Sequence, residues 1–165
     1  MHGVDRETLV ARVADHYNHP RHRGRIQNPD VSAPGGNPGC GDRLTLHVRA
    51  EPGEERIAEA SFEGEGCTLS IAAASLLLGR VNRDRASFQE VHDISYEEMI
   101  DLLGREVVGS RYRCATLALG TLKAAVRTIE MDRKLRAAGY SEQQIRDLRD
   151  GGMRRRADPP ASTPP

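Results

Sequence analysis

Three cysteines and one aspartate are the residues whose types and spacing point most directly to chemistry. The cysteines are Cys40, Cys67 and Cys114, and no two of them form a Cys-x-x-Cys pair. Because their number is odd, they cannot all be joined in disulfides within the chain. Asp42 stands two residues after Cys40, and a glycine stands on either side of this cysteine. The backbone can therefore turn there so that the thiol and the carboxylate face one point.

Three thiolates and one carboxylate make up a set of four ligands for a soft metal ion. Zn²⁺ binds such a set tetrahedrally, with Zn–S distances near ~2.3 Å, and the same set can hold an iron–sulfur cluster. Arg113, which directly precedes Cys114, would offset part of the negative charge of the ligands. The spacing alone leaves two alternatives open, which are inert core cysteines and a single reactive thiol.

Each cysteine stands next to the expected start of a secondary-structure element. Cys40 lies in a stretch rich in glycine and proline just before a strand pattern. Cys67 follows a Gly-Glu-Gly sequence at the expected start of one helix, and Cys114 stands at the expected start of another. Helix N-termini carry partial positive charge, which favours the thiolate form of a cysteine. We therefore expect Cys67 and Cys114 to ionise readily.

Hydrophobic periodicity predicts a mixture of helices and strands. Apolar and polar residues alternate over residues 43–49 and 57–62, and a Pro-Gly turn separates them, which predicts a hairpin. A capping box at residues 95–98 predicts a short helix that ends at Gly104. Apolar residues at helical spacing predict further helices over residues 4–18, from residue 68 or 69, from residue 114, and over residues 141–149.

Composition and charge exclude several classes of protein. The 24 basic and 24 acidic side chains cancel, so the chain has no global basic field, which argues against a dedicated nucleic-acid binder. The longest apolar run, residues 71–78, is too short to span a bilayer, and the N-terminus has no apolar signal region. We therefore expect a cytoplasmic protein with reduced thiols and no membrane partner.

Four stretches of the sequence resemble the U-type iron–sulfur cluster assembly proteins, which comprise IscU, SufU and the N-terminal domain of NifU. The stretches are LVARVADHYNHPRHRG (residues 9–24), NPGCGD (37–42), FEGEGCTLSIAAASLL (62–77) and RYRCATLALGTLKAAV (111–126). The resemblance implies an α+β fold, in which a small antiparallel three-stranded sheet packs against several helices and the metal site lies at one tip. The strand missing from the predicted hairpin would lie within residues 28–34.

The resemblance also implies roles for single residues and a division of the chain. Cys40, Asp42, Cys67 and Cys114 would be the ligands, with Arg113 in contact with the ligands rather than with the metal. Residues 1–131 would form the U-type domain. Periodicity and composition, rather than the resemblance, predict an additional helical segment at residues 132–150 and a disordered, proline-rich tail at residues 151–165.

Features around the third cysteine distinguish the branches of this family. The IscU branch places a histidine directly before that cysteine and a Leu-Pro-Pro chaperone motif upstream. This chain has Arg113 and the sequence VVGSRY at residues 107–112 instead. The sequence RYRCATL around Cys114 looks like SufU. The gap of 47 positions from Cys67 to Cys114 is nearer to the length in IscU.

The resemblance favours a SufU-like, zinc-dependent sulfur acceptor. It would receive persulfide sulfur on Cys40 from a SufS-like cysteine desulfurase and pass it to downstream iron–sulfur assembly or acceptor proteins. In this case the protein would act as a sulfurtransferase. The alternative is an IscU-like scaffold on which a transient [2Fe–2S] cluster is assembled and transferred, with Cys114 as the sulfur acceptor. A third hypothesis is a metal-stabilised interaction module without sulfur chemistry.

Overall fold

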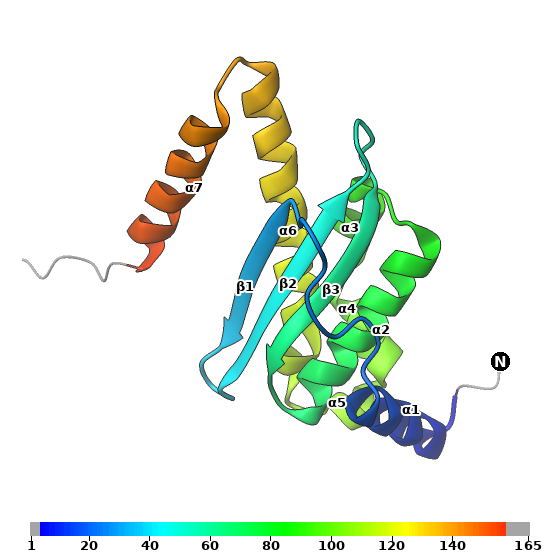
Figure 1. Ribbon diagram of the computed structural model, residues 1–165. Coiled ribbons are helices and arrows are strands. Elements are labelled where there is room, and N and C mark those ends of the chain that lie inside the picture. Colours follow the sequence, from blue (N-terminus) through cyan, green and yellow to red (C-terminus); the bar gives the residue numbers. More distant parts are fainter. Residues whose placement is uncertain (1–3, 158–165) are drawn as a thin grey trace, which may run out of the picture. The chain divides into compact units, whose positions relative to one another are not determined.

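The structure is a computed structural model that describes residues 4–157 of the 165-residue chain (Figure 1). Contacts divide the chain into two compact units, residues 1–128 and residues 129–165. The first unit contains the sheet and the helices that position the cysteines. None of the helices in the described part of the chain is long and apolar enough to cross a membrane.

The sheet has three antiparallel strands in the order β1-β2-β3, which confirms the expected fold class. Its strands are β1 (Val31–Asn37), β2 (Asp42–Ala50) and β3 (Ile57–Glu65). The strand that the hairpin pattern did not include is β1. It begins within the predicted range of residues 28–34 and continues three residues further, to Asn37. Its Pro34-Gly35-Gly36 sequence is typical of a loop, yet an edge strand tolerates a proline because one side of it needs no N–H group.

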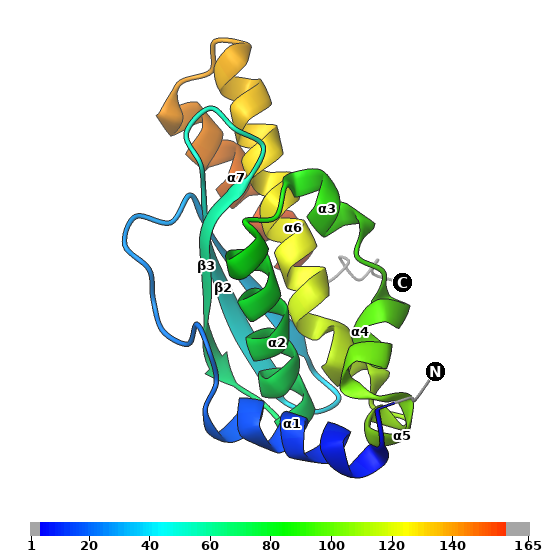
Figure 2. The same cartoon turned by 90° about the vertical axis from the view of Figure 1, so that its right-hand side faces the viewer.

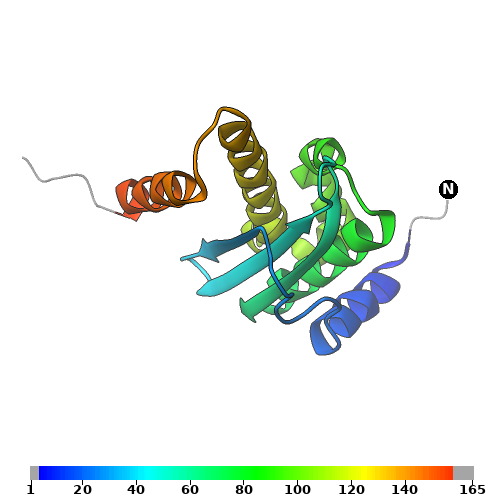
Figure 3. The same ribbon diagram turned by 45° about the horizontal axis from the view of Figure 1, so that its top comes forward.

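Helices cover one face of the sheet. They are α2 (Thr68–Asp84) and the first part of α6 (Tyr112–Ala137), both on the same side of the strands (Figures 2 and 3). The alternating residues Leu44, Leu46 and Val48 of β2 are buried on this face. The sequence pattern of β2 thus places every second side chain in the core, as a half-buried strand requires.

The remaining helices of the first unit surround α2. They are α1 (Arg6–Asn18), which packs against α2, and α3 (Phe88–Asp93), α4 (Tyr96–Leu103) and α5 (Arg105–Val108). Ser95 caps α4 by accepting the N–H of Glu98 at 3.0 Å, and the helix ends at Gly104, as predicted. The Glu98 side chain pairs with Arg80. The complete capping box belongs to α3, where it links Ser87 and Glu90.

The second unit contains the end of α6 and the helix α7 (Glu142–Ala157). Within it, Arg149 donates to Asp132 at 3.0 Å, and Ile145 is buried. The helix predicted over residues 141–149 is confirmed but longer, so the expectation of disorder from residue 151 is wrong for residues 151–157. Two glycines at 151–152 cost a helix about 1 kcal/mol each, which the helix-forming residues after them can offset. Residues 158–165 of the expected tail lie outside the described residues.

Candidate metal centre

Cys40 lies in the turn that joins β1 to β2. The turn is closed by a hydrogen bond of 3.1 Å from the Cys40 N–H to the carbonyl of Asn37. Gly41 has φ +71°, a left-handed conformation that residues with a Cβ rarely adopt. Cys40 is the only exposed cysteine of the three. Cys40 is therefore an exposed residue in a tight, glycine-flanked turn.

Asp42 begins β2 and is almost completely buried, with 1% of its surface exposed. Its Oδ1 accepts the backbone N–H of Cys67 at 2.8 Å, and its Oδ2 accepts the hydroxyl of Ser70 at 2.6 Å. Burial opposes ionisation of this carboxyl. The hydrogen bonds from Ser70 and Cys67 outweigh burial and hold the pKa of Asp42 below its ordinary value. Asp42 is therefore a carboxylate at neutral pH.

Cys67 is the residue at which α2 begins, as the sequence predicted. Its side chain is half-buried and makes no capping hydrogen bond to the helix. The Sγ atom lies 3.9 Å from Oδ2 of Asp42 and 3.3 Å from Oγ of Ser70. The start of α2 thus directs this thiol toward the carboxylate rather than toward its own backbone.

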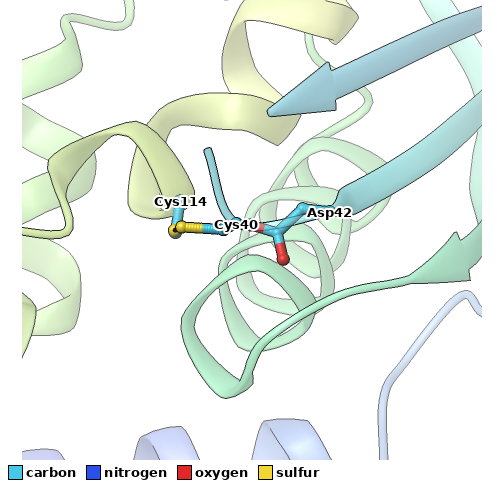
Figure 4. A group of neighbouring side chains, drawn as sticks. All are labelled: Cys40, Asp42 and Cys114. Carbon is cyan, nitrogen blue, oxygen red and sulfur yellow. Dashed lines mark hydrogen bonds between the residues drawn. The ribbon is translucent and has the colours of Figure 1, made fainter. Parts of the chain in front are cut away.

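Cys114 lies in the first turn of α6 and is 1% exposed. Its Sγ is 3.3 Å from Sγ of Cys40 (Figure 4), and the side-chain amide of Asn37 donates to it at 3.5 Å. Burial, followed by hydrogen bonding to Cys40 and Asp42, raises the pKa of Cys114 well above its ordinary value. The expectation that the helix N-terminus makes Cys114 ionise readily is therefore wrong in the metal-free chain, because desolvation outweighs the helix dipole.

The structure brings all four predicted ligands into one cluster. Donor atoms of Cys40, Asp42 and Cys114 lie within 4.8 Å of one another, and Cys67 joins them through its contact with Asp42. Figure 4 shows the thiol of Cys40 pointing at that of Cys114, with Asp42 beside Cys40. That these four side chains are the ligands stays a prediction, but they are close enough to act together.

Arg113 directly precedes Cys114 in sequence. Its side chain is exposed and lines a surface groove together with Tyr96, Arg105 and Tyr112. Among the described residues, no lysine or arginine donates a hydrogen bond to the four clustered side chains. The influence of Arg113 on the charge of the site therefore stays a prediction.

Two residues of the site were missed from the sequence. Asn37 donates to the Cys114 thiol, and Ser70 donates to the Asp42 carboxylate. Asn37 stands three positions before Cys40 and Ser70 three positions after Cys67. The sequence could have indicated Ser70, because residues three apart in a helix lie on the same face and Ser70 is three positions after Cys67. For Asn37 there was no such indication, since its partner comes from a distant helix.

The donor set fits a metal ion that prefers sulfur ligands. Three thiols and a carboxylate are ligand types that Zn²⁺ takes in proteins, and thiolates also hold iron–sulfur clusters. The cluster is mostly buried. When its thiols and carboxyl ionise, a bound cation would compensate their buried negative charge. The arrangement can therefore serve as a metal centre with one exposed thiol, Cys40.

Comparison with known proteins gives the family. The profile of the NifU-like N-terminal domain matches residues 9–136. The chain belongs to this family. The match covers all four clustered residues of this NifU-like domain.

Two curated relatives of the NifU-like domain carry different functional names. It is 32% identical to the iron–sulfur cluster assembly scaffold protein IscU of Thermotoga maritima, over 71% of this chain and 91% of the relative. It is 30% identical to the zinc-dependent sulfurtransferase SufU of Bacillus subtilis, over 73% of this chain and 90% of the relative. The two sequence identities are nearly equal. The comparison therefore establishes the family but does not distinguish the IscU branch from the SufU branch.

Solved structures agree with the fold. The N-terminal NifU-like protein of Brucella abortus superposes with a TM-score of 0.63, at 18% identity, over 73% of this chain and 92% of the other. This similarity concerns the architecture of the sheet and helices.

Proposed function

We propose that this NifU-like domain is a SufU-like sulfur acceptor that holds zinc and receives persulfide sulfur from a cysteine desulfurase. The observation that carries the proposal is the difference in exposure among the three thiols. Cys40 is exposed, Cys67 is half-buried and Cys114 is buried. A partner enzyme that presents a persulfide can therefore reach Cys40 without any rearrangement of the helices.

The proposed zinc ligands are Cys40, Asp42, Cys67 and Cys114, the cluster described above. Bound zinc would keep the thiols in the thiolate form, because a coordinated thiol is deprotonated. The effect matters most for Cys114, whose pKa is raised by burial in the metal-free chain.

The transfer step requires one nucleophile on this chain. The Cys40 thiolate attacks the outer sulfur of the persulfide on the desulfurase, and a new S–S bond forms at Cys40. The S–S bond on the desulfurase breaks, and its cysteine leaves as a thiolate. Attack needs a sulfur that can approach its target. The turn at residues 38–41 presents Cys40 at the surface, whereas Cys114 is held within a helix.

The residue before Cys114 supports the SufU-like branch. Position 113 is an arginine, not the histidine of the IscU branch, and it lies among the residues that line a surface groove. The relative named as a zinc-dependent sulfurtransferase, SufU of Bacillus subtilis, matches over 73% of this chain. The partners implied are a SufS-like desulfurase and a downstream iron–sulfur assembly or acceptor protein.

A scaffold function is the second candidate, favoured by the short gap between Cys67 and Cys114 and by the similarity to IscU of Thermotoga maritima. The same four side chains would then hold a [2Fe–2S] cluster as cargo. Cys114 would take the incoming sulfur in that case. Its burial argues against direct attack on a partner's persulfide.

Sulfur transfer to defined cysteines distinguishes the two candidates. The purified protein is incubated anaerobically with a SufS-type desulfurase and cysteine, and persulfides are located by mass spectrometry. We expect one persulfide on Cys40, one zinc per chain and a faster desulfurase turnover. The Cys40→Ala variant should fold and accept no sulfur. A persulfide on Cys114 in that variant, together with iron and sulfide after reconstitution, would favour the scaffold.

A further inference from the structure

Ser70 is a buried serine whose hydroxyl serves the metal centre rather than its own helix. It stands in the first turn of α2, and none of its surface is exposed. Its hydroxyl donates to Oδ2 of Asp42 at 2.6 Å. Its hydroxyl oxygen also lies 3.3 Å from Sγ of Cys67.

The Asp42 carboxylate is held at both oxygens by the start of α2. The Cys67 N–H holds Oδ1 at 2.8 Å, and the Ser70 hydroxyl holds Oδ2. Gly66 packs closely against both residues. A Cβ added there would lie 3.1 Å from Oδ1 of Asp42 and 3.1 Å from Cβ of Ser70. The carboxylate therefore has one fixed orientation, with a donor on each oxygen.

Local helix formation does not account for this serine. The N-cap of α2 is Cys67, which makes no capping hydrogen bond with its side chain. Asp42, from a strand, accepts the backbone N–H of Cys67, one of the N–H groups at the start of α2 that have no partner within the helix. The Ser70 hydroxyl points to this same carboxylate, so its partner is a residue of the metal centre from another element.

We propose that Ser70 is a positioning residue that orients Asp42 for metal binding. The inference rests on the zinc site of the proposed function. A carboxylate oxygen that accepts one hydrogen bond keeps another lone pair for a metal. The hydrogen bond thus fixes the ligand without occupying its remaining site, as groups behind metal ligands commonly do. Without the hydroxyl, Oδ2 loses its donor in a buried position, and the Cys67 N–H alone still holds the carboxylate.

Zinc affinity of two matched variants tests the proposal. Ser70→Ala removes the hydroxyl from Asp42, and Ser75→Ala removes an equally buried hydroxyl from the same helix. Ser75 contacts His16 and the Arg21 N–H, not the metal centre. The three residues at 72–74 are already alanines, and alanine favours helix, so α2 should persist in both variants.

The measurement is zinc dissociation in competition with a chromophoric chelator, with thermal melting of each metal-free protein alongside. We expect Ser70→Ala to bind zinc about 10- to 100-fold more weakly than the parent. We expect Ser75→Ala to bind zinc as the parent does, whatever its melting temperature. The visible spectrum of the cobalt-substituted protein should change for Ser70→Ala alone, because one ligand has moved.

A double variant identifies the residue through which Ser70 acts. In an Asp42→Ala background, Ser70→Ala should have no further effect on zinc affinity. Unchanged affinity in the single Ser70→Ala variant would overturn the proposal, and so would an equal loss in both backgrounds. The sulfur-transfer assay is separate, so a parent that binds zinc but accepts no sulfur contradicts the proposed function and leaves the role of Ser70 standing. A parent that binds no zinc overturns both.

Discussion

The thiols of Cys40 and Cys114 lie 3.3 Å apart, although 74 positions of sequence separate the two residues. One belongs to an exposed turn between two strands, and the other is buried in the first turn of a long helix. The pair thus joins the thiol of an exposed residue to one that is anchored in the core. This difference is the physical basis for assigning sulfur acceptance to Cys40.

The exposed and the buried thiol should differ in their contribution to stability. Cys40→Ala is expected to change the free energy of unfolding of the metal-free protein by less than about 0.5 kcal/mol, as surface substitutions do. Cys114→Ala should cost more, about 1–3 kcal/mol, because it leaves the side-chain amide of Asn37 without its acceptor at a buried site. Urea denaturation in the presence of a chelator measures both, and equal costs would contradict the difference in burial.

Removal of metal should lower the melting temperature of the parent protein. A ligand that binds the folded state alone stabilises it by about 2.7 kcal/mol at a concentration of 100 times its dissociation constant. Calorimetry with zinc and then with excess chelator checks this. The Asp42→Ala variant is the control, and its melting temperature should respond less to zinc. A parent with the same melting temperature in both conditions would argue against the metal centre.

Loss of the Asp42 carboxylate should have two separable effects. In the metal-free protein it leaves the Cys67 N–H and the Ser70 hydroxyl without their acceptor, at a cost of about 1–3 kcal/mol. If the protein is a scaffold, a reconstituted [2Fe–2S] cluster should persist longer in Asp42→Ala, because a carboxylate is a more labile ligand than a thiolate. Decay of the visible absorption measures the second effect, and a cluster lost as fast as in the parent would count against the scaffold.

The stability of the first unit should rise as the pH increases from the lowered pKa of His16 to about 6.5. Burial, together with the nearby Arg21, lowers the pKa of His16 below its ordinary 6.5. The unfolded chain therefore binds more protons than the folded chain in this range. The stabilisation is complete above pH 6.5 and is lost as the pH falls through the lowered pKa. Melting temperatures measured across this range should rise with pH, and His16→Gln should reduce this rise. An unchanged pH dependence in His16→Gln would show that other groups cause it.

Close packing of β1 against α6 should make Gly35 intolerant of a side chain. A Cβ at this position would lie 2.0 Å from Oγ1 of Thr121, whereas one at Gly36 would lie 3.6 Å from the nearest atom, the Asp42 carbonyl oxygen. We expect Gly35→Ala to destabilise the protein by about 1–3 kcal/mol, as overpacking does, and Gly36→Ala to cost less. Similar unfolding midpoints in urea for the two variants would contradict this packing.

Local sequence patterns predicted most of the elements and failed where tertiary packing overrides them. The hairpin, the helix starts at residues 68 and 96 and the glycine at the end of α4 follow from periodicity, capping residues and turn residues. The edge strand β1 was only partly predicted, because Pro34-Gly35-Gly36 favours a loop unless a neighbouring strand pairs with it. The extension of α7 through two glycines was missed for the same reason, since propensity is a weak guide.

The sequence by itself determined which side chains could form the centre, because a cysteine beside a glycine turn or at a helix start is a local pattern. It also carried the family resemblance that the comparisons confirm. Only the tertiary structure decided that Cys40 is exposed while Cys114 is buried, with a pKa raised rather than lowered. It alone showed that Asn37 and Ser70 hold the thiol and the carboxylate. Burial and hydrogen bonding at this site depend on a turn, a strand and two helices that are distant in sequence, and no local pattern records which of them will meet.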